Sequence, residues 1–180
     1  MIPAAHQTRD IAMTFSIYRA SIPVLLRNLR NLKNILKKGE AFAAAKGIDP
    51  KELIGASLAP DMYALARQVQ VATDMAKGCA GRLAGIEIPS YADTETTFPE
   101  LYARIDKTLA FIESVKEAQF AGADARQVTI KLRSGEFQFT GADYLLNFVM
   151  PNFYFHMTTA YGILRHKGVE LGKMDFVGGA

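Results

Sequence analysis

The stretch NFYFHMTTAYGILRHKG, residues 152–168, decides the fold, because it combines helical spacing of apolar residues, one histidine in mid-helix and a glycine stop. The same spacing continues upstream to Thr140-Gly141, so one long helix is expected between this dipeptide and Gly168. Pro151 lacks an amide hydrogen and predicts a break or a kink midway. The positions expected to face the core are Leu145, Phe148, Phe155, Thr159 and Ile163.

Apolar residues at alternating spacings of three and four predict three earlier helices that pack nearly parallel to one another. Pro23 predicts a kink in the first of them. The third begins with Thr97-Phe98-Pro99-Glu100, a capping box in which the threonine oxygen caps an amide and the glutamate reaches back. The expected ranges are 15–39, followed by a short separate helix at 40–47, then 60–85 and 97–122.

The period changes to two before the last helix, where residues 128–132 and 137–139 alternate around Ser134-Gly135. This pattern predicts a small β-hairpin, with Gly135 free to take a positive φ angle. The tail after Gly168 is short and mixed, and we expect an extended strap. The sequence therefore predicts an all-α fold, a four-helix bundle with a small β-hairpin before the last helix.

Composition narrows the functional class. The chain has 180 residues, 49% of them apolar and 22% charged, which fits one globular domain. No run approaches the roughly 18 apolar residues of a membrane span, and residues 1–12 lack the apolar segment of a secretory signal. We therefore expect a cytoplasmic protein without a membrane partner. Cys79 is the only cysteine, which excludes an internal disulfide, and a net charge of +3 is too mild to indicate nucleic-acid binding.

His156 is the first candidate site residue, and its neighbours argue against a metal centre. Asn152 and Ala160 occupy the positions one turn away, and His166 lies ten residues on, roughly 15 Å along a helix axis. A stable metal site needs at least three protein ligands. We expect no bound metal and no cofactor, and a hydrogen-bonded His156 in the core or in a pocket.

A second polar set lies on the second predicted helix, where side chains at i, i+4, i+7 and i+11 share one face. Its members are Tyr63, Arg67, Gln70 and Asp74. Arginine offers a planar pair of donors to a carboxylate or a phosphate, so this set suits a pocket for a small polar or anionic ligand. A solvated face or a polar network between helices explains the same residues. If Asn152, His156 and Thr159 face this set across the bundle, the two groups enclose a polar cavity and one of the four side chains bonds to His156.

Three segments, residues 58–78, 97–112 and 151–176, resemble an uncharacterised bacterial family, a domain of unknown function within the DinB/YfiT-like helical-bundle superfamily. The resemblance covers residues 13–178 and implies an up-down-down-up four-helix bundle and a homodimer. Small residues on the second helix, among them Gly78, Ala80 and Gly81, allow another backbone to approach closely, either inside the bundle or at such a subunit contact. Relatives that start at a residue like Met13 imply that residues 1–12 are an N-terminal extension and 13–180 the domain.

The resemblance leaves two functions open. Many members of the superfamily are metal-dependent thiol transferases or hydrolases that use three histidines, one on the second helix and an i, i+4 pair on the fourth. Of that set, only His156 is present here. We therefore favour a bundle without metal that binds a small polar or anionic ligand between helices two and four. The alternative is a divergent metal-dependent transferase or hydrolase with His156 as a base or as part of a degenerate metal site.

Overall fold

The computed structural model describes residues 16–132 and 135–178, and its longest element is α1 (Ile17–Lys46). The leucines and isoleucines spaced by three and four are buried along one side of α1: Ile22, Leu25, Leu29, Leu32, Ile35 and Leu36. The expected separate helix at 40–47 is wrong, because α1 continues through Gly39. A Cβ on Gly39 would lie 3.0 Å from Leu164 Cδ2, so this glycine allows two helices to approach and does not end one.

The second long helix begins later than expected. After α2 (Pro50–Ile54), which Asp49 caps, the chain turns through Pro60, and α3 (Leu65–Ala84) starts where the Leu65 amide donates to the Ala56 carbonyl. The predicted start at residue 60 is wrong, because Pro60 lies in a turn in which the Met62 amide donates to the Ala59 carbonyl. The predicted end is confirmed at Gly85, which has a φ of 70°.

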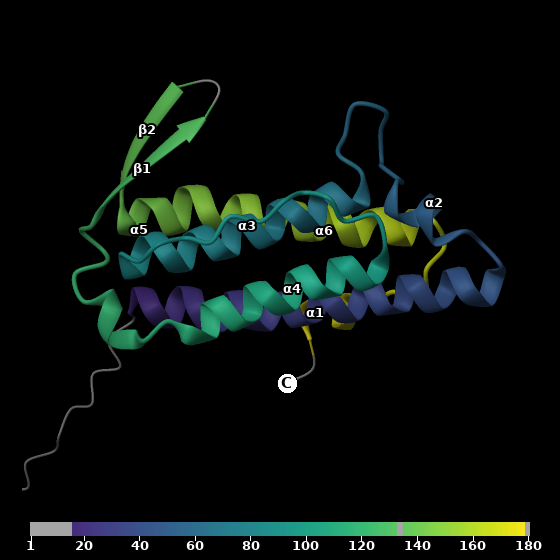
Figure 1. Cartoon of the computed structure of the whole chain (residues 1–180), viewed down its shortest axis with the longest axis horizontal. Helices are drawn as coiled ribbons and strands as arrows, with labels where there is room; N and C mark the ends of the chain where they lie inside the picture. The colour runs from purple at the N-terminus through teal and green to yellow at the C-terminus, as the bar shows by residue number, and fades with distance from the viewer. Residues whose placement is uncertain (1–15, 133–134, 179–180) are drawn as a thin grey trace, which may run out of the picture.

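The third long helix, α4 (Phe98–Ser114), opens with the predicted capping box of Thr97 and Glu100, which is confirmed. It ends at Ser114 and not near Gly122. Val115 leaves the helix in extended conformation and buries its side chain, and the 3₁₀ turn η1 (Glu117–Phe120) follows. The segment between α3 and α4, residues 85–97, runs back along the outside of the bundle (Figure 1).

The hairpin is confirmed. Strands β1 (Gln127–Leu132) and β2 (Gly135–Thr140) pair antiparallel, with Leu132 opposite Gly135. It projects from the end of the bundle at which the last helix begins (Figure 1). Val128 and Ile130 are buried, so one face of its base contacts the core.

The last helix passes through Pro151 without a break. The segments α5 (Gly141–Asp143), the π-helical η2 (Tyr144–Val149) and α6 (Met150–His166) follow one another directly. A π-helical turn takes in more residues than an α-helical turn, so the buried face moves on by about one residue. Val149 is buried where Phe148 was expected. Leu145, Thr159 and Ile163 are buried as expected, whereas Phe155 is 56% exposed. The predicted core position of Phe155 is therefore wrong.

The tail is only partly an extended strap. Val169 and Leu171 are buried, but α7 (Lys173–Val177) forms a short helix that packs on α1. Asn31 of α1 donates to the Phe176 carbonyl at 3.0 Å. The glycine stop of α6 at Gly168 is confirmed.

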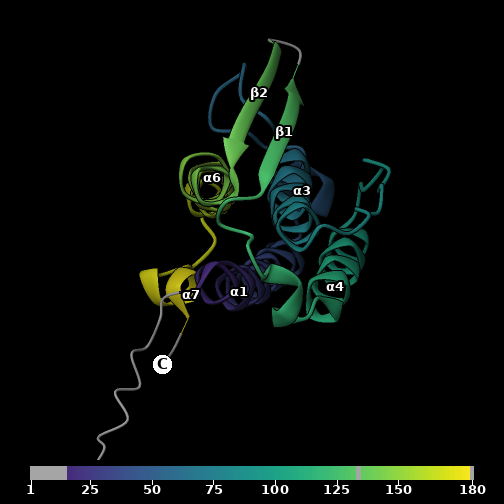
Figure 2. The ribbon, with the colours of Figure 1, turned by 90° about the vertical axis from the view of Figure 1, so that its left-hand side faces the viewer.

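Figure 2 shows the long helices end on, with α3 packed against α6 and α4, and α1 packed against α4. The core lies between them, so the described residues form a mostly helical domain with one two-stranded hairpin. None of the helices in residues 16–132 and 135–178 has the length and apolar character needed to traverse a lipid bilayer. The expected N-terminal extension, 1–12, and the expected start at Met13 lie outside the described residues.

Candidate functional site

His156 lies in the contact between α6 and α3 and is 8% exposed. Its Nδ1 atom is 2.7 Å from Oε1 of Gln68 on α3. The expectation of an inward-facing, hydrogen-bonded His156 is confirmed, but its partner is not one of the four expected side chains. Gln68 takes that role because it is buried on the α6 side of α3, one position from Arg67.

The contacts of Gln68 determine the proton position on His156. The Gln68 amide nitrogen donates to the Tyr63 carbonyl at 3.0 Å, and a carbonyl only accepts. The Gln68 oxygen therefore faces His156, and Nδ1 must carry the hydrogen that it donates. In the neutral ring, Nε2 is then left as an acceptor.

Nε2 of His156 reaches accessible space. Nε2 makes no hydrogen bond within the described residues. Every fully buried side-chain nitrogen or oxygen atom in these residues does have a hydrogen-bond partner. The atom is therefore not sealed in the core. Burial of the ring and the nearby positive charge of Arg67 lower the pKa of His156 below 6.5, so the ring is neutral at pH 7.

This lowered pKa predicts how stability depends on pH. As the pH falls, His156 binds a proton at a higher pH in the unfolded chain than in the folded chain. The contribution of His156 to the free energy of unfolding is therefore complete above pH 6.5 and is lost as the pH falls through the lower pKa of the folded state. Urea unfolding at pH 7.5 and pH 5.5 should show that His156→Phe loses less stability on acidification than the wild type. His166→Phe, at an exposed position of the same helix, should behave like the wild type. Equal losses in all three proteins would contradict this prediction.

Three members of the predicted polar stripe face away from His156 and toward the segment after α3. Arg67 pairs with Asp93, the Gln70 amide donates to Glu95 at 3.0 Å, and Asp74 lies 3.0 Å from Arg104 on α4. Tyr63 precedes α3 and is exposed, with its ring near the Arg67 guanidinium. The set is therefore not a single face, and most of it forms a polar network between α3, α4 and residues 91–95.

Arg104 is the centre of this network. Its side chain is fully buried on α4 and uses each of its nitrogen atoms as a donor. The acceptors are Thr73 Oγ1 at 2.8 Å, the Ala92 carbonyl at 3.0 Å, Glu95 at 3.1 Å, and Asp74 and Asp93 at 3.0 Å. Lys77 adds an ion pair to Asp74 at 2.9 Å, and its ammonium lies 4.1 Å from the centre of the Tyr91 ring. These contacts hold the segment 91–95 against two helices.

Asn152 and Thr159, the other predicted site residues on α6, bond to their own helix. The Asn152 amide donates to the Phe148 carbonyl at 2.6 Å, and the Thr159 hydroxyl donates to the Phe155 carbonyl at 2.7 Å. Thr159 nevertheless lines a groove of about 480 Å³, together with Leu58, Tyr154 and Phe155.

Arg67 and Gln70 line a different cavity. It measures about 520 Å³ and lies between α2, the start of α3 and residues 95–96, so it shares no lining residue with the groove on α6. The predicted residues are therefore divided between two sides of α3, and His156 lines neither of these two cavities.

Gln68, Asp93, Glu95 and Arg104 were not among the predicted site residues. A signal existed for Arg104, because it follows Leu101 by three residues and precedes Ile105 in the apolar stripe of α4. A charged residue at such a position needs partners inside the fold. Gln68 gave no comparable signal, since glutamine is common on exposed helix faces. Within the described residues, no three histidine, cysteine or acidic side chains are grouped so as to hold a metal ion.

Comparisons with known proteins agree with this architecture. A family model described as a domain of unknown function, DUF1993, matches residues 17–177. A DinB family member protein from Shewanella denitrificans, known from its crystal structure, is 41% identical over 91% of this chain and 92% of that chain, with a TM-score of 0.84. No curated protein matches. The chain therefore belongs to the DUF1993 family and is similar in sequence and fold to a DinB family member.

Proposed function

We propose that this protein is a DinB-like bundle that binds a small polar or anionic molecule where α3 meets α6. The single observation that carries the proposal is the pair of hydrogen bonds that joins the Tyr63 carbonyl to Gln68 and Gln68 to His156. These bonds leave Nε2 of His156 as a fixed acceptor. A buried neutral imidazole with an accessible lone pair suits a ligand that offers an N–H or O–H donor.

The proposal includes the up-down-down-up order of the bundle. The colours of Figure 1 support it: α1 runs from left to right, α3 and α4 run from right to left, and α6 runs from left to right again. In this order α3 and α6 run antiparallel, so that Gln68 near the start of α3 meets His156 near the middle of α6.

A thermal-shift panel of small carboxylic acids, phosphate esters, alcohols and thiols tests the proposal. A compound that binds at the α3 and α6 contact should raise the melting temperature of the wild type, because binding to the folded state alone stabilises it. His156→Phe should abolish that rise, while His166→Phe, which changes an exposed histidine on the same helix, should keep it. A panel without stabilising compounds, or one in which every hit persists in His156→Phe, would overturn the proposal.

The second candidate is a divergent metal-dependent transferase or hydrolase, and one observation favours it. Gln68 on α3 meets His156 at 2.7 Å, the contact in which the histidine-rich members of the superfamily are expected to place a ligand on each helix. An amide oxygen is a weak ligand for a transition metal beside imidazole. Elemental analysis after growth in metal-supplemented medium decides between the candidates. We expect far less than one transition-metal ion per chain. A ratio near one metal ion per chain that is lost in His156→Ala would favour the enzyme.

We also propose a homodimer whose contact lies on η2 and α6. Residues 144–164 contain no Asp, Glu, Lys or Arg, yet Leu146 is 58% and Phe155 56% exposed. A face without charge can meet its own copy across a two-fold axis without like-charge repulsion, and an apolar exposed face is typical of subunit contacts. The small residues Gly78, Ala80 and Gly81 are buried inside the protomer, so they do not supply this contact.

Light scattering should give a mass near twice 19.8 kDa. Phe155→Glu puts a charge at the centre of the uncharged face and should shift the mass toward that of one chain. Met174→Glu, at a similarly exposed position on α7, should leave the dimer intact. A wild-type mass of one chain at high concentration would rule out this dimer.

A further inference from the structure

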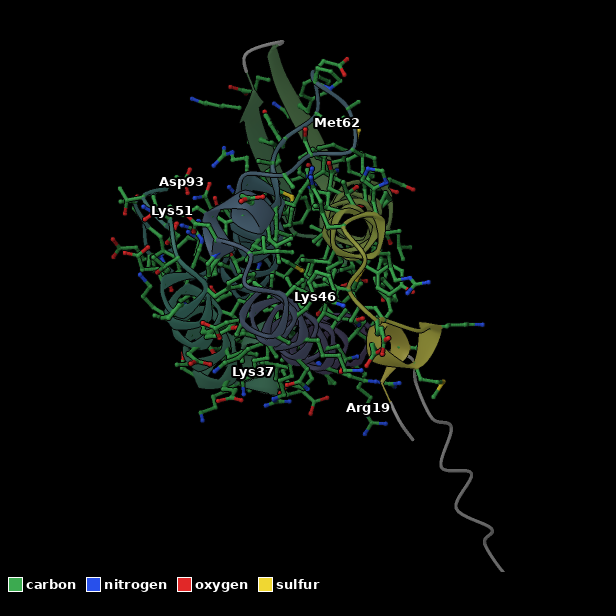
Figure 3. The ribbon with its side chains drawn as sticks, turned by 90° about the vertical axis from the view of Figure 1, so that its right-hand side faces the viewer. Arg19, Lys37, Lys46, Lys51, Met62 and Asp93 are labelled. Carbon is green, nitrogen blue, oxygen red and sulfur yellow. The ribbon has the colours of Figure 1, made fainter. Side chains whose placement is uncertain are left out.

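The cavity beside the start of α3 brings together two cations from different elements. Its lining consists of Lys51, Ile54 and Gly55 from α2 and its end, Ala64, Ala66, Arg67 and Gln70 from α3 and its cap, and Glu95 and Thr96. Its volume of about 520 Å³ lies within the range of small-molecule sites. Figure 3 shows Lys51 and Asp93 at the same corner of the molecule, where Asp93 pairs with Arg67.

Positive charge is in excess in this cavity. Lys51 makes no ion pair within the described residues. Arg67 uses only Nη1, which contacts Asp93 and Gln70, so Nε and Nη2 remain as donors. Glu95 is the one carboxylate in the lining, and Arg104 and Gln70 already bind it. The network therefore neutralises Glu95, and Arg67, although paired with Asp93, keeps two donor atoms free, while Lys51 has no acidic partner within the described residues.

The backbone adds donors to the same space. Ala64 caps α3 without a side-chain hydrogen bond, and the Ala66 and Arg67 amides have no acceptor in the part of the chain that the structure describes. Ile54, Ala64 and Ala66 form an apolar wall next to these donors. The lining thus combines two cationic side chains, backbone amide donors and apolar side chains.

We infer that this cavity binds a small organic anion, with a phosphate or carboxylate group held by Arg67 and Lys51 and a short apolar portion against Ile54 and Ala66. Arginine and backbone amides suit both anions, since they present donors in directions that two oxygen atoms can accept. This site uses Arg67 but not His156, so it does not depend on the ligand site proposed above.

Amide NMR spectra of the full chain, titrated with inorganic phosphate and with butyrate, test the inference. We expect at least one of the two anions to give saturable shifts at the Ala66 and Arg67 amides. Lys51→Gln and Arg67→Gln should each weaken the apparent affinity about tenfold, the cost of one charge-assisted hydrogen bond. Lys37→Gln is the matched control, because this exposed lysine on α1 lies well apart from Lys51 in Figure 3 and carries the same charge.

Two results would overturn the inference: no saturable shift with either anion, or an equal loss of affinity in Lys37→Gln and Lys51→Gln, which would indicate attraction to net charge alone. Lys51 is exposed on a short helix, so its variant tests the site even if Arg67→Gln disturbs the segment at Asp93. His156→Phe should keep the affinity for phosphate and butyrate. A loss of binding in that variant would place the anion at the α3 and α6 contact and not in this cavity.

Discussion

Replacing Arg104 with methionine should lower the free energy of unfolding by about 3 kcal/mol, the lower end of the cost of breaking a buried ion pair. Methionine fills much of the same volume but leaves Asp74, Asp93 and Glu95 without their shared cation. Asp74 and Asp93 are about a third exposed, at 34% and 38%, so they can regain water and reduce the cost. Glu95 is 9% exposed and cannot do so as easily.

Urea and thermal unfolding followed by circular dichroism should show this loss, with a fall in melting temperature of about 6–12 °C for a domain of this size. Arg30→Met is the matched control, because Arg30 pairs with Glu113 at the surface, where both side chains are about half exposed. That variant should change stability by less than about 1 kcal/mol. Similar losses in the two variants would show that the Arg104 network contributes no more than a surface pair.

Replacing Gly141 with alanine should have an effect of similar size, about 3 kcal/mol or more, for a different reason. A Cβ at this position would lie 1.8 Å from the Ala123 carbonyl oxygen, a backbone atom that cannot rotate away. The neighbouring Ala142 amide donates to the Asp124 carbonyl at 3.0 Å, so the segment before the hairpin touches the start of the last helix. An added methyl group must separate the two.

Gly172→Ala is the control for Gly141→Ala, because nothing lies within 4 Å of a Cβ at Gly172 and its φ is −122°. The control should keep the stability of the wild type within about 0.5 kcal/mol. Circular dichroism and the dispersion of the NMR spectrum would report both variants. A Gly141→Ala protein as stable as Gly172→Ala would show that the approach of residues 123 and 141 is not required for folding.

Local signals in the sequence determined where several elements begin and end. The Thr97 and Glu100 capping box, Gly85 after α3 and the alternation on each side of Gly135 depend on neighbours within a few residues, and each prediction from them holds. The apolar stripe of α1 also follows from spacing alone. Such features can be predicted because their hydrogen bonds and φ angles are set by the nearby chain.

Predictions that needed the neighbours of a helix were less reliable. The contact of α6 with α3 places His156 inward and leaves Phe155 56% exposed, although Thr159 and Ile163 on the same helix are buried as expected. Gly39 looked like a helix end but is a contact with Leu164. In both cases the deciding interaction lies outside the segment whose spacing was considered.

The composition of the candidate site was decided by tertiary structure. The sequence by itself determined that His156 lies on a helix, that it has no second histidine one turn away and that Arg67, Gln70 and Asp74 lie on one side of another helix. Only packing joined Gln68 to His156 over 88 residues of sequence and turned the other three toward Arg104 and residues 93–95. The physical reason is that helical spacing determines which side chains share a face of one helix. Which other helix packs against that face depends on the burial of apolar surface between helices that are distant in sequence.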